Sequence, residues 1–414
     1  MSVSRRFVGL GLTAMALTGC VSSGGTAQTK ASSAAPGMRP VPNAGYDQWV
    51  QGFQSRAAAR GIPQATINSA FRGAGFLPGV IDRDRNQTEF SRTLEDYLAI
   101  AASPERVAKG RAALARHRGT LNAIESRFGV EAEVVAAVWG LESQYGERRG
   151  DINVISALST LAYDGRRGAF FESQLIAALR ILANGDTSPA NMTGSWAGAM
   201  GHTQFIPTSY LQFAVDFTGD GRRDIWSADP TDALASTAAY LSRSGWRKGQ
   251  PWGYEVRLPT GFNTGLAGRG KGKSADAWSA LGVRKADGGS LPGYSGSILL
   301  PQGANGPAFL ITSNFNAIAR YNNAVNYVIG VGHLSDRLGG GGPIKGNFPP
   351  DAQGMTIADR QELQRRLTAA GFDTEGSDGV IGAKTRAAIE AFQRSRGLTI
   401  TGEPSMELLL LLRR

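Results

Sequence analysis

Trp139-Gly-Leu-Glu-Ser-Gln-Tyr-Gly146 is the stretch of this 414-residue chain that says most about its fold and chemistry. Apolar residues recur at helical spacing over residues 134–141, which predicts a helix that ends near Glu142. Taken alone, Glu142 is equally well a solvated carboxylate at a helix end. The neighbouring Trp139 and Tyr145 change that balance, because apolar walls raise the pKa of a carboxyl group towards that of a useful acid.

A second dense segment follows about fifty residues later, Gly194-Ser-Trp-Ala-Gly-Ala-Met-Gly-His-Thr-Gln-Phe-Ile-Pro-Thr-Ser-Tyr210. It offers hydroxyl groups, an amide and aromatic surfaces. Neither segment contains a nucleophile–base pair or a ligand cluster for a catalytic transition metal. The three histidines of the chain are scattered, which disfavours a zinc site. The combination suits sugar chemistry driven by a single proton-transferring carboxylate.

The first twenty residues predict an export signal. Arg5-Arg6 precede an apolar run over residues 7–17, which is too short to span a bilayer. Leu17-Thr-Gly-Cys20 resembles the cleavage site of bacterial lipoproteins, which implies lipidation of Cys20. Val21 in the next position implies sorting to the outer membrane. A twin-arginine signal is the alternative to general secretory export.

The formal net charge is +10, and Cys20 is the only cysteine. A mature protein with one thiol forms no internal disulfide and has no cysteine-based metal site. An export signal excludes nucleic acid as the partner for the positive charge. A polyanion of the envelope, such as carboxylate-bearing wall peptides, is the natural partner, although the charge could simply set solubility.

After the export signal at residues 1–20, composition divides the chain into four further parts. Residues 21–44 are rich in Ser, Gly, Ala and Pro and predict a flexible tether. Residues 45–338 are largely helical, with one helix opening at Ser103 and running through 114–121 and another over 316–338. Short alternating runs predict a β-rich insertion at about 251–312. Residues 339–356 form a linker, and residues 357–414 form a compact helical domain.

Residues 46–338 resemble the membrane-bound lytic murein transglycosylase B family, and residues 357–411 resemble the common peptidoglycan-binding module. The first resemblance rests on Val80-Ile-Asp-Arg-Asp-Arg85, Glu89-Phe90, Trp139–Gly146, Leu161-Ala-Tyr-Asp-Gly-Arg-Arg167, Gly194–Tyr210 and Ile318-Ala-Arg-Tyr-Asn-Asn323. The second rests on Leu363-Gln364, Gly371-Phe372, Asp378-Gly-Val-Ile-Gly382, Thr385, Ala391-Phe-Gln393 and Gly397-Leu398. The resemblance implies a mainly α (α+β) fold: a lysozyme-like helical core with a small β-rich insertion, then a C-terminal three-helix domain.

For the chemistry, the resemblance implies that Glu142 is the catalytic residue. It would protonate the oxygen between N-acetylmuramic acid and N-acetylglucosamine, then take the proton from the muramyl 6-hydroxyl as a 1,6-anhydro ring closes. The muramyl 2-acetamido group would replace a second carboxylate. Two alternatives stay open: a muramidase that lets water attack, and a non-catalytic wall-binding protein of the envelope.

Supporting roles follow from the family positions, each beside a plainer interpretation. Ser195 would bond the substrate or Glu142, or else cap the following helix, and His202 would touch the sugar. Arg166 and Arg167 would bind carboxylates of the stem peptide, or else be solvated. The remaining substrate-binding candidates, which could also be ordinary packing or surface residues, are Gln204, Tyr240, Tyr321, Asn322 and Tyr327.

Residues 216–227 follow the spacing of an EF-hand calcium loop, with Gly221 in the sixth place. The twelfth place holds Ser227 in place of a bidentate Glu, which weakens or removes the affinity. A plain Asp-Gly turn is the alternative, and no cofactor is expected for catalysis. The predicted ligands of a structural calcium ion are Asp216, Thr218, Asp220, Arg222 and Asp224.

The sequence and the resemblance together predict a periplasmic monomer held by its lipid, most naturally at the outer membrane. Its expected partners are the glycan strands and stem peptides of peptidoglycan, the membrane, and enzymes of wall synthesis. Nucleic acid is not an expected partner.

Overall fold

The computed structural model describes residues 37–86 and 93–414. The chain forms two compact units, and of the described residues one unit holds 93–108 and 249–414 and the other holds 37–86 and 109–248. The predicted export signal with Cys20, Glu89-Phe90 and most of the tether lie outside the described residues. Among the described residues, no helix has the length and apolar character needed to cross a membrane.

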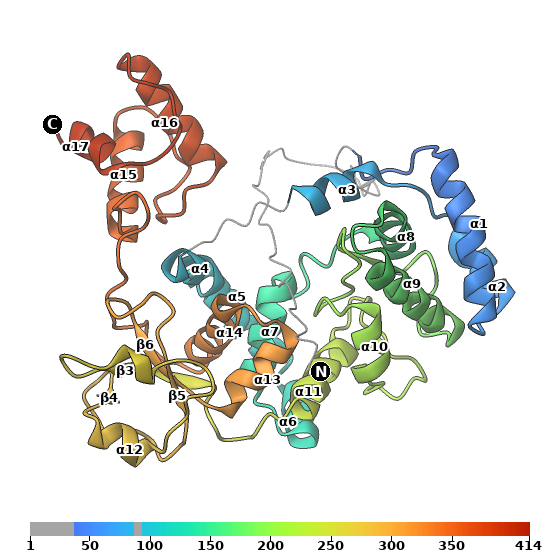
Figure 1. Cartoon of the computed structure of the whole chain (residues 1–414), viewed down its shortest axis with the longest axis horizontal. Coiled ribbons are helices and arrows are strands. Elements are labelled where there is room, and N and C mark those ends of the chain that lie inside the picture. Colours follow the sequence, from blue (N-terminus) through green and yellow to red (C-terminus); the bar gives the residue numbers. More distant parts are fainter. Residues whose placement is uncertain (1–36, 87–92) are drawn as a thin grey trace. The chain divides into compact units, whose positions relative to one another are not determined.

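The unit that contains Glu142 is almost entirely helical (Figure 1). Helix α5 (Pro104–Arg116) passes from one unit into the other. The elements of the Glu142 unit are α1 (Ala44–Ala59), α2 (Gln64–Phe71), α3 (Pro78–Arg85), α6 (Arg118–Phe128), α7 (Ala132–Ser143), β1 (Ile152–Asn153), α8 (Val154–Asp164), α9 (Gly168–Ala183), β2 (Thr193–Gly194), α10 (Pro207–Phe213) and α11 (Thr231–Arg243).

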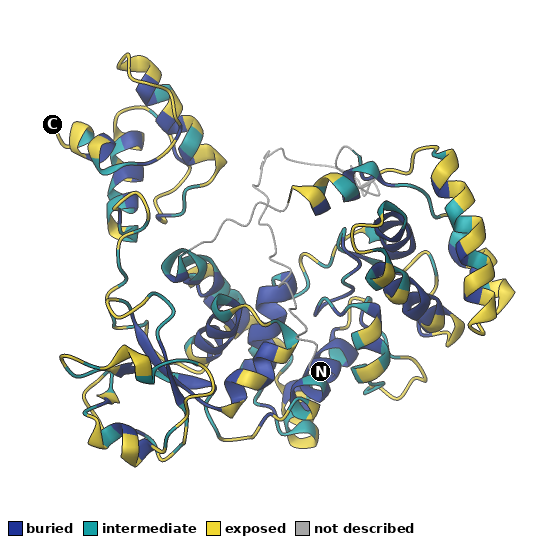
Figure 2. Ribbon diagram, viewed as in Figure 1, coloured by how far each residue is buried: buried dark blue, intermediate teal, exposed yellow. Residues whose placement is uncertain are grey.

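Helices α7, α8 and α9 supply much of the core of this unit (Figure 2). The Asn153 side chain begins α8 by accepting a hydrogen bond from the Ser156 amide at 2.8 Å. Gly165 ends α8 in the left-handed conformation, with φ of 82°. The short connection that follows lets α9 pack back against α8 as a helical hairpin.

The N-cap predicted at Ser103 is confirmed, since its hydroxyl oxygen accepts a hydrogen bond from the Arg106 amide at 3.2 Å. The prediction of one continuous helix through residues 114–121 is wrong. The helix ends at Arg116 and α6 begins at Arg118, because His117 leaves helical geometry with φ of −106° and ψ of 19°. Its ring then packs edge-on against Trp139, with the ring centroids 5.6 Å apart.

The other unit contains the predicted β-rich insertion as a four-stranded antiparallel sheet of order β4-β3-β6-β5. Val256 pairs with Ala308, and Leu299 pairs with Phe309. Trp278 is fully buried against the sheet, and its indole N–H donates to the Gly296 carbonyl at 2.8 Å. The elements of this region are β3 (Gly253–Arg257), η1 (Thr264–Leu266), α12 (Ala275–Ala280), β4 (Arg284–Lys285), β5 (Ser297–Leu299) and β6 (Ala308–Ile311).

Residues 316–338 form two helices, where a single one was predicted. Helix α13 (Ser313–Tyr321) ends at Asn322, which is extended with φ of −147°, and α14 begins at Val325 and runs to Leu338. The Asn322 side chain accepts a hydrogen bond from the Ala324 amide at 3.0 Å. Asparagine side chains compete with helical hydrogen bonds in this way, and the break follows from that local contact. Helix α4 (Leu94–Ala101) packs against α14 in the same unit.

The C-terminal domain is a three-helix unit of α15 (Ile357–Ala369), α16 (Ala383–Ser395) and α17 (Met406–Arg413). Thr356 and Asp359 form a capping box that begins α15. Leu363, Phe392 and Leu409 meet in its core. The apolar run at the C-terminus is only partly buried. Leu409 belongs to the core of the domain, whereas Leu410 is 50% exposed. The predicted fold class is thereby confirmed.

The last residues of the predicted tether are packed onto the fold, which corrects that part of the prediction. Met38 is buried, and the Val41 amide donates a hydrogen bond to the Phe76 carbonyl at 3.0 Å. Composition alone suggested flexibility here, but a short backbone pairing holds this segment in place.

Candidate active site

Helix α7 is buried along nearly its whole length, and Glu142 lies in its last turn. A helix that is apolar all round is typical of a protein core, and this one carries its single buried carboxylate into that core. Glu142 is 7% exposed. The sequence therefore places an acid where it has little contact with solvent.

The chain turns sharply after Glu142. Gln144, Tyr145 and Gly146 all have positive φ, of 51°, 59° and 89°. Left-handed geometry is strained for residues other than glycine, and such strain costs on the order of 1–3 kcal/mol per residue. The turn folds the Tyr145 ring back over Gly140, where a Cβ atom would lie 2.6 Å from the ring. Gly140 is thus needed for close packing of Tyr145 beside the acid.

Ser195 and Gln204 lie against the segment that follows this turn. The Gln204 amide nitrogen donates to the Arg149 carbonyl at 2.9 Å, and β1 pairs Ile152 with Gly194. The backbone at Gly150 lies so close to this strand that a Cβ atom there would be 2.7 Å from the Ser195 nitrogen. Both predicted residues are therefore held next to the chain segment that leaves the Glu142 turn.

The alternative role of Ser195 as a helix cap is wrong. Its side-chain oxygen accepts a hydrogen bond from the Ala199 amide at 3.0 Å, and residues 195–199 form a tight turn with no helix after it. Gln204 uses its amide nitrogen a second time, on the Gly201 carbonyl at 2.9 Å. Its carbonyl oxygen accepts no hydrogen bond from the described residues, so it can receive one from a ligand.

His202 does not fit the expectation of a sugar contact. It is 3% exposed, its Nδ1 lies 3.2 Å from the Trp139 Nε1, and its Nε2 lies 2.8 Å from the Ser227 carbonyl oxygen. Burial lowers the pKa of this imidazole to about 4. A neutral ring with both nitrogens bonded to protein takes no proton from a substrate.

Arg166 is fixed by the protein itself. Its Nε and Nη2 each lie 2.5 Å from a carboxylate oxygen of buried Asp84 on α3, a bidentate pair that the sequence analysis did not identify. The neighbouring Arg167 is exposed and stacks over Phe170, with its guanidinium carbon 4.4 Å from the ring centroid. Contact with stem peptides stays a prediction for both arginines.

The remaining candidates belong to different parts of the molecule. Tyr240 on α11 packs against Phe213, with ring centroids 4.2 Å apart, in the unit that contains Glu142. Tyr321, Asn322 and Tyr327 lie at the α13–α14 break in the other unit. Their grouping with Glu142 stays a prediction.

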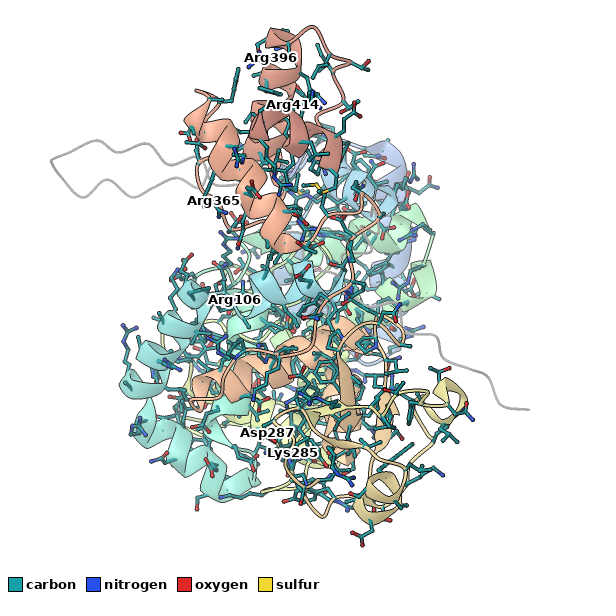
Figure 3. All side chains as sticks on the ribbon, turned by 90° about the vertical axis from the view of Figure 1, so that its left-hand side faces the viewer. Arg106, Lys285, Asp287, Arg365, Arg396 and Arg414 are labelled. Atoms are coloured by element: carbon teal, nitrogen blue, oxygen red, sulfur yellow. The ribbon has the colours of Figure 1, made fainter. Side chains whose placement is uncertain are left out.

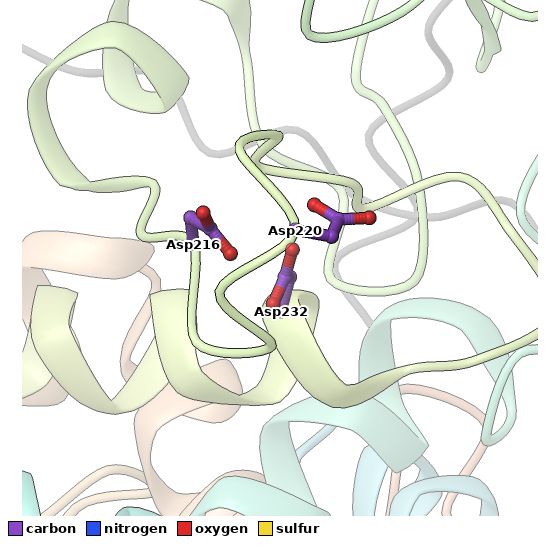
Figure 4. A group of neighbouring side chains, drawn as sticks. All are labelled: Asp216, Asp220 and Asp232. Carbon is purple, nitrogen blue, oxygen red and sulfur yellow. The ribbon is translucent and has the colours of Figure 1, made fainter.

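Two carboxylates of the predicted calcium loop form a cluster with a third from α11. Asp216, Asp220 and Asp232 each present an oxygen within 4.8 Å of the others, as Figure 4 shows. Asp232 is 2% exposed and lies beyond the twelfth loop place, so the EF-hand spacing did not reveal it. Burial raises its pKa, although three backbone amides donate to its carboxylate.

The other predicted calcium ligands surround this cluster. A cavity of about 140 Å³ is lined by Thr218, Asp220, Asp224 and Asp232, with Ser227 and Asp229. Asp224 Oδ1 accepts hydrogen bonds from the Trp226 and Ser227 amides, which leaves its other oxygen for a cation. The backbone amide of Arg222 donates a hydrogen bond to Asp220 Oδ1 at 2.9 Å. Oxygen donors of this kind suit calcium.

Four side-chain carboxylates are buried in the described part of the chain. Asp84 binds Arg166, Asp186 binds Arg223, and Asp232 accepts backbone amides. The fourth is Glu142. Among the buried acids it is the one placed beside the aromatic turn, and it is the best candidate for proton transfer.

Comparison with known proteins identifies the family of the chain. The "Transglycosylase SLT domain" family matches residues 45–336, and a peptidoglycan binding domain family matches residues 356–412. The membrane-bound lytic murein transglycosylase B of Escherichia coli (strain K12) is 32% identical over 248 residues. That match covers 58% of this chain, and the chain spans 66% of the length of that relative, just under two thirds.

Solved structures of two proteins extend the comparison. SltB3 from Pseudomonas aeruginosa, in complex with NAG-NAM-pentapeptide, is 49% identical with a TM-score of 0.73, covering 90% of this chain and 100% of that one. The same protein has been seen with NAG-anhNAM-pentapeptide. The Escherichia coli lytic transglycosylase Slt35, in complex with calcium, is 27% identical with a TM-score of 0.60, covering 72% of this chain and 93% of that one.

The chain belongs to the transglycosylase SLT domain family. Its activity is that of a peptidoglycan lytic transglycosylase, and it carries a C-terminal peptidoglycan-binding domain. The resemblance stated from the sequence motifs is confirmed, and the interpretation as a non-catalytic wall-binding protein is wrong.

Proposed function

We propose that Glu142 is the acid and then the base of a non-hydrolytic cleavage of peptidoglycan. In the first step Glu142 gives its proton to the oxygen that leaves with N-acetylglucosamine, and the bond from that oxygen to muramyl C1 breaks. In the second step the muramyl 6-oxygen bonds to C1, and its proton returns to Glu142. No water is consumed, and the acid is regenerated.

The burial of Glu142 at the C-terminal end of α7 carries this proposal. An unionised acid is needed at the start of the cycle, and both burial and the negative end of a helix favour the uncharged form. The muramyl 2-acetamido group supports the positive charge at C1, so that a second carboxylate is not needed. SltB3, with its NAG-anhNAM-pentapeptide ligand, supports the anhydro product by similarity.

Mass analysis of soluble products from purified peptidoglycan tests the ring closure. Products that end in 1,6-anhydromuramic acid are expected, lighter by one water than the corresponding reducing ends. Reducing-end muramyl products alone would show that water attacks and would make the enzyme a muramidase.

Substrate contacts are proposed for the polar groups beside the Glu142 turn. The carbonyl oxygen of Gln204 and the hydroxyl of Ser195 are the first candidates, because both residues are held against the segment that leaves the Glu142 turn. Tyr240 extends the set within the same unit, and exposed Arg167 offers a guanidinium to stem-peptide carboxylates. The family resemblance adds Tyr321, Asn322 and Tyr327 as substrate-binding candidates. Glycan strands and their peptides are the partners that this set fits.

The C-terminal domain is proposed to hold the enzyme on its insoluble substrate. Its surface carries the exposed arginines Arg365, Arg396 and Arg414 (Figure 3), which suit the carboxylates of stem peptides. Linking a binding domain to a catalytic one raises the effective substrate concentration without new catalytic contacts.

A structural calcium ion is proposed at the carboxylate cluster of Asp216, Asp220 and Asp232. Three carboxylates this close repel one another, and a divalent cation relieves that repulsion. The calcium-bound Slt35 supports the proposal by similarity. The ion would brace the loop and take no part in proton transfer.

Peptidoglycan lies in the cell envelope, and the enzyme acts there. We further propose that Cys20 is lipidated and anchors the protein to the outer membrane from the periplasm. Fractionation of cells that express Cys20→Ser tests this. Wild-type protein is expected in the outer-membrane fraction and the variant in the soluble periplasm, and equal distribution of the two would contradict the anchor.

A further inference from the structure

His202 joins the Glu142 turn to residues 224–227, the last part of the predicted calcium loop. On one side its Nδ1 accepts a hydrogen bond from the Trp139 indole N–H at 3.2 Å. On the other side its Nε2 lies 2.8 Å from the Ser227 carbonyl oxygen. A ring that satisfies both contacts carries its proton on Nε2 and accepts at Nδ1. Arg149 Nη1 also lies 3.2 Å from Nε2, and in this tautomer it donates to the Trp226 carbonyl at 2.8 Å and not to the ring. The two contacts therefore require one and the same neutral tautomer.

The backbone of His202 reinforces this contact directly next to the acid. The Ser143 hydroxyl donates to the His202 carbonyl at 2.5 Å and accepts from the Gly146 amide at 2.9 Å. A Cβ atom on Gly146 would lie 2.6 Å from His202 Nδ1. His202 thus contacts Trp139, Ser143 and Gly146, and Glu142 lies between the first and second of these in the chain.

The opposite side of the ring is anchored just as firmly. The His202 amide donates to the Ile225 carbonyl at 3.0 Å, and Arg149 donates to the Trp226 carbonyl at 2.8 Å. The Asp224 carboxylate accepts from the amides of Trp226 and Ser227, which fixes the carbonyl that receives the His202 proton. Residues 224–227 are therefore a rigid support for the imidazole.

We propose that His202 is a positioning residue that sets the orientation of Glu142 by tying the 139–146 turn to residues 224–227. This inference rests on the proposed role of Glu142. His202 acts through Trp139, Ser143 and Gly146 and does not touch the substrate, because both ring nitrogens are bonded within the protein and the ring is buried. The strained turn after Glu142 needs such an external support, since Gln144 and Tyr145, neither of them glycine, both have positive φ.

Two substitutions separate the two contacts of the ring. His202→Asn keeps an acceptor close to the position of Nδ1 and loses the bond to Ser227. His202→Gln keeps a donor that reaches Ser227 and loses the acceptor for Trp139. Trp139→Phe removes the indole N–H from the same bond while it retains an aromatic ring in the core. Steady-state kinetics on a soluble glycan of disaccharide-peptide repeats, well below each unfolding midpoint, then give kcat and KM separately.

The expected result is a fall in kcat of about tenfold to 100-fold for both His202 variants, with KM within about twofold, because small misplacements of a catalytic group cost this much. The effects of Trp139→Phe and His202→Gln should not add, since both break one bond. His117→Gln is the matched control. Its ring also packs on Trp139, at 5.6 Å between centroids, but donates no hydrogen bond to it, and kcat should be unchanged.

Other outcomes overturn the inference. An unchanged kcat in both His202 variants, with only the unfolding midpoint lowered, would make His202 a packing residue. A raised KM with unchanged kcat would mean substrate contact. If neither His202 variant folds, the kcat of Trp139→Phe decides: a fall supports the positioning role, and an unchanged kcat rejects it. Glu142→Gln is measured in parallel: its inactivity together with normal kcat in the His202 variants rejects only the positioning role, whereas its full activity rejects the role of Glu142 itself.

Discussion

At the scale of single residues, three side chains of the 139–146 segment make contacts that hold the chain on both sides of Glu142. Trp139 donates to His202, Ser143 bonds both His202 and Gly146, and Tyr145 packs over Gly140. The chain thus uses small residues where rings approach closely. The buried acid is held by contacts on both sides of it in the sequence.

Gly140 is a residue at which packing should override helix propensity. Alanine normally stabilises a helix interior relative to glycine by about 1 kcal/mol. In Gly140→Ala the new Cβ atom would lie 2.6 Å from the Tyr145 ring, so we expect a net loss of about 1–3 kcal/mol and lower activity. Thermal unfolding and the rate of product release measure both effects.

Gly119→Ala is the control for this prediction. Gly119 lies in α6, and no atom lies within 4 Å of its ideal Cβ position. This variant should be slightly more stable than the wild type and fully active. Equal stabilisation by both substitutions would show that Tyr145 does not pack as described.

The free energy of unfolding should depend on pH through His202. Burial lowers the pKa of its imidazole from 6.5 to about 4, so the unfolded chain takes up the proton first as the pH falls. The stability contributed by the neutral ring is therefore complete above about pH 6.5 and is lost towards pH 4. The loss is on the order of 3 kcal/mol, since one pKa unit corresponds to about 1.4 kcal/mol.

Urea unfolding of the wild type and His202→Gln across this pH range measures the difference. Asp336, whose pKa burial raises to about 7, titrates in an overlapping range with the opposite sign, but it is present in both proteins and cancels. The stability advantage of the wild type should shrink as the pH falls. A constant difference would mean that the folded and unfolded states protonate His202 equally.

Some of these residues could be predicted from the sequence and others could not. Glu142 was identifiable because its aromatic neighbours lie within four residues of it. Asp84 and Asp232 were not, because their burial depends on Arg166 and on backbone amides of other segments. The role of His202 was missed for the same reason: Trp139 lies 63 positions away in the sequence.

At the scale of elements, periodicity located the helices but not their interruptions. The breaks at His117 and at Asn322 both lie inside runs whose apolar spacing continues. One break lets a ring pack on Trp139, and the other is stabilised by a side chain that bonds its own backbone. The β-rich insertion was predictable because glycine, proline and asparagine separate its short alternating runs.

Calcium should stabilise the loop that connects α10 to α11. Saturating calcium is expected to raise the unfolding midpoint, with a gain of about 2.7 kcal/mol at a calcium concentration of 100 times the dissociation constant. Asp232→Asn should abolish the calcium-dependent rise, whatever its effect on the metal-free protein. Thermal unfolding with and without calcium, supported by calorimetric titration, provides the measurement.

An aspartate-to-asparagine substitution outside the calcium cluster supplies the control. Asp287 is an exposed aspartate paired with Lys285 at 2.9 Å (Figure 3), and Asp287→Asn should keep the full response to calcium. A wild-type protein whose midpoint and heat of titration do not respond to calcium would contradict the proposed site.

At the scale of the whole molecule, one buried arginine ties the C-terminal domain to the rest of its unit. Arg360 on α15 is 2% exposed and forms ion pairs with Asp96 on α4 and with Asp351 in the linker. The Ile357 amide also donates to Glu95 at 3.3 Å. The binding domain is therefore docked through ionic contacts on α4, although the sequence predicted only a linker between domains.

Arg360→Met should release this contact. Removal of one partner of a buried ion pair lowers the free energy of unfolding by about 3–5 kcal/mol. In Arg360→Met, Asp96 and Asp351 both lose the guanidinium that pairs with them. We expect a lower unfolding midpoint and faster thermolysin cleavage within residues 339–356. Arg365→Met, on the exposed face of the same helix, should resemble the wild type. Identical digestion of all three proteins would show that the contact does not hold the linker.

The order of the domains and their class could be predicted from motifs, because the motifs are dense and follow one another along the chain. The docking contact could not. Arg360 and Asp96 are separated by 264 positions, and an arginine in a polar helix gives no sequence signal that it is buried.

The central claim is that Glu142 transfers the protons, and Glu142→Gln tests it most directly. The variant keeps the size of the side chain but has no acid to give. Release of anhydromuropeptides from purified peptidoglycan should fall to the limit of detection, with thermal unfolding and wall binding unchanged. Glu147→Gln, the same substitution at an exposed site five residues further on, should keep wild-type activity. Release of anhydro products by Glu142→Gln at the wild-type rate would contradict the account.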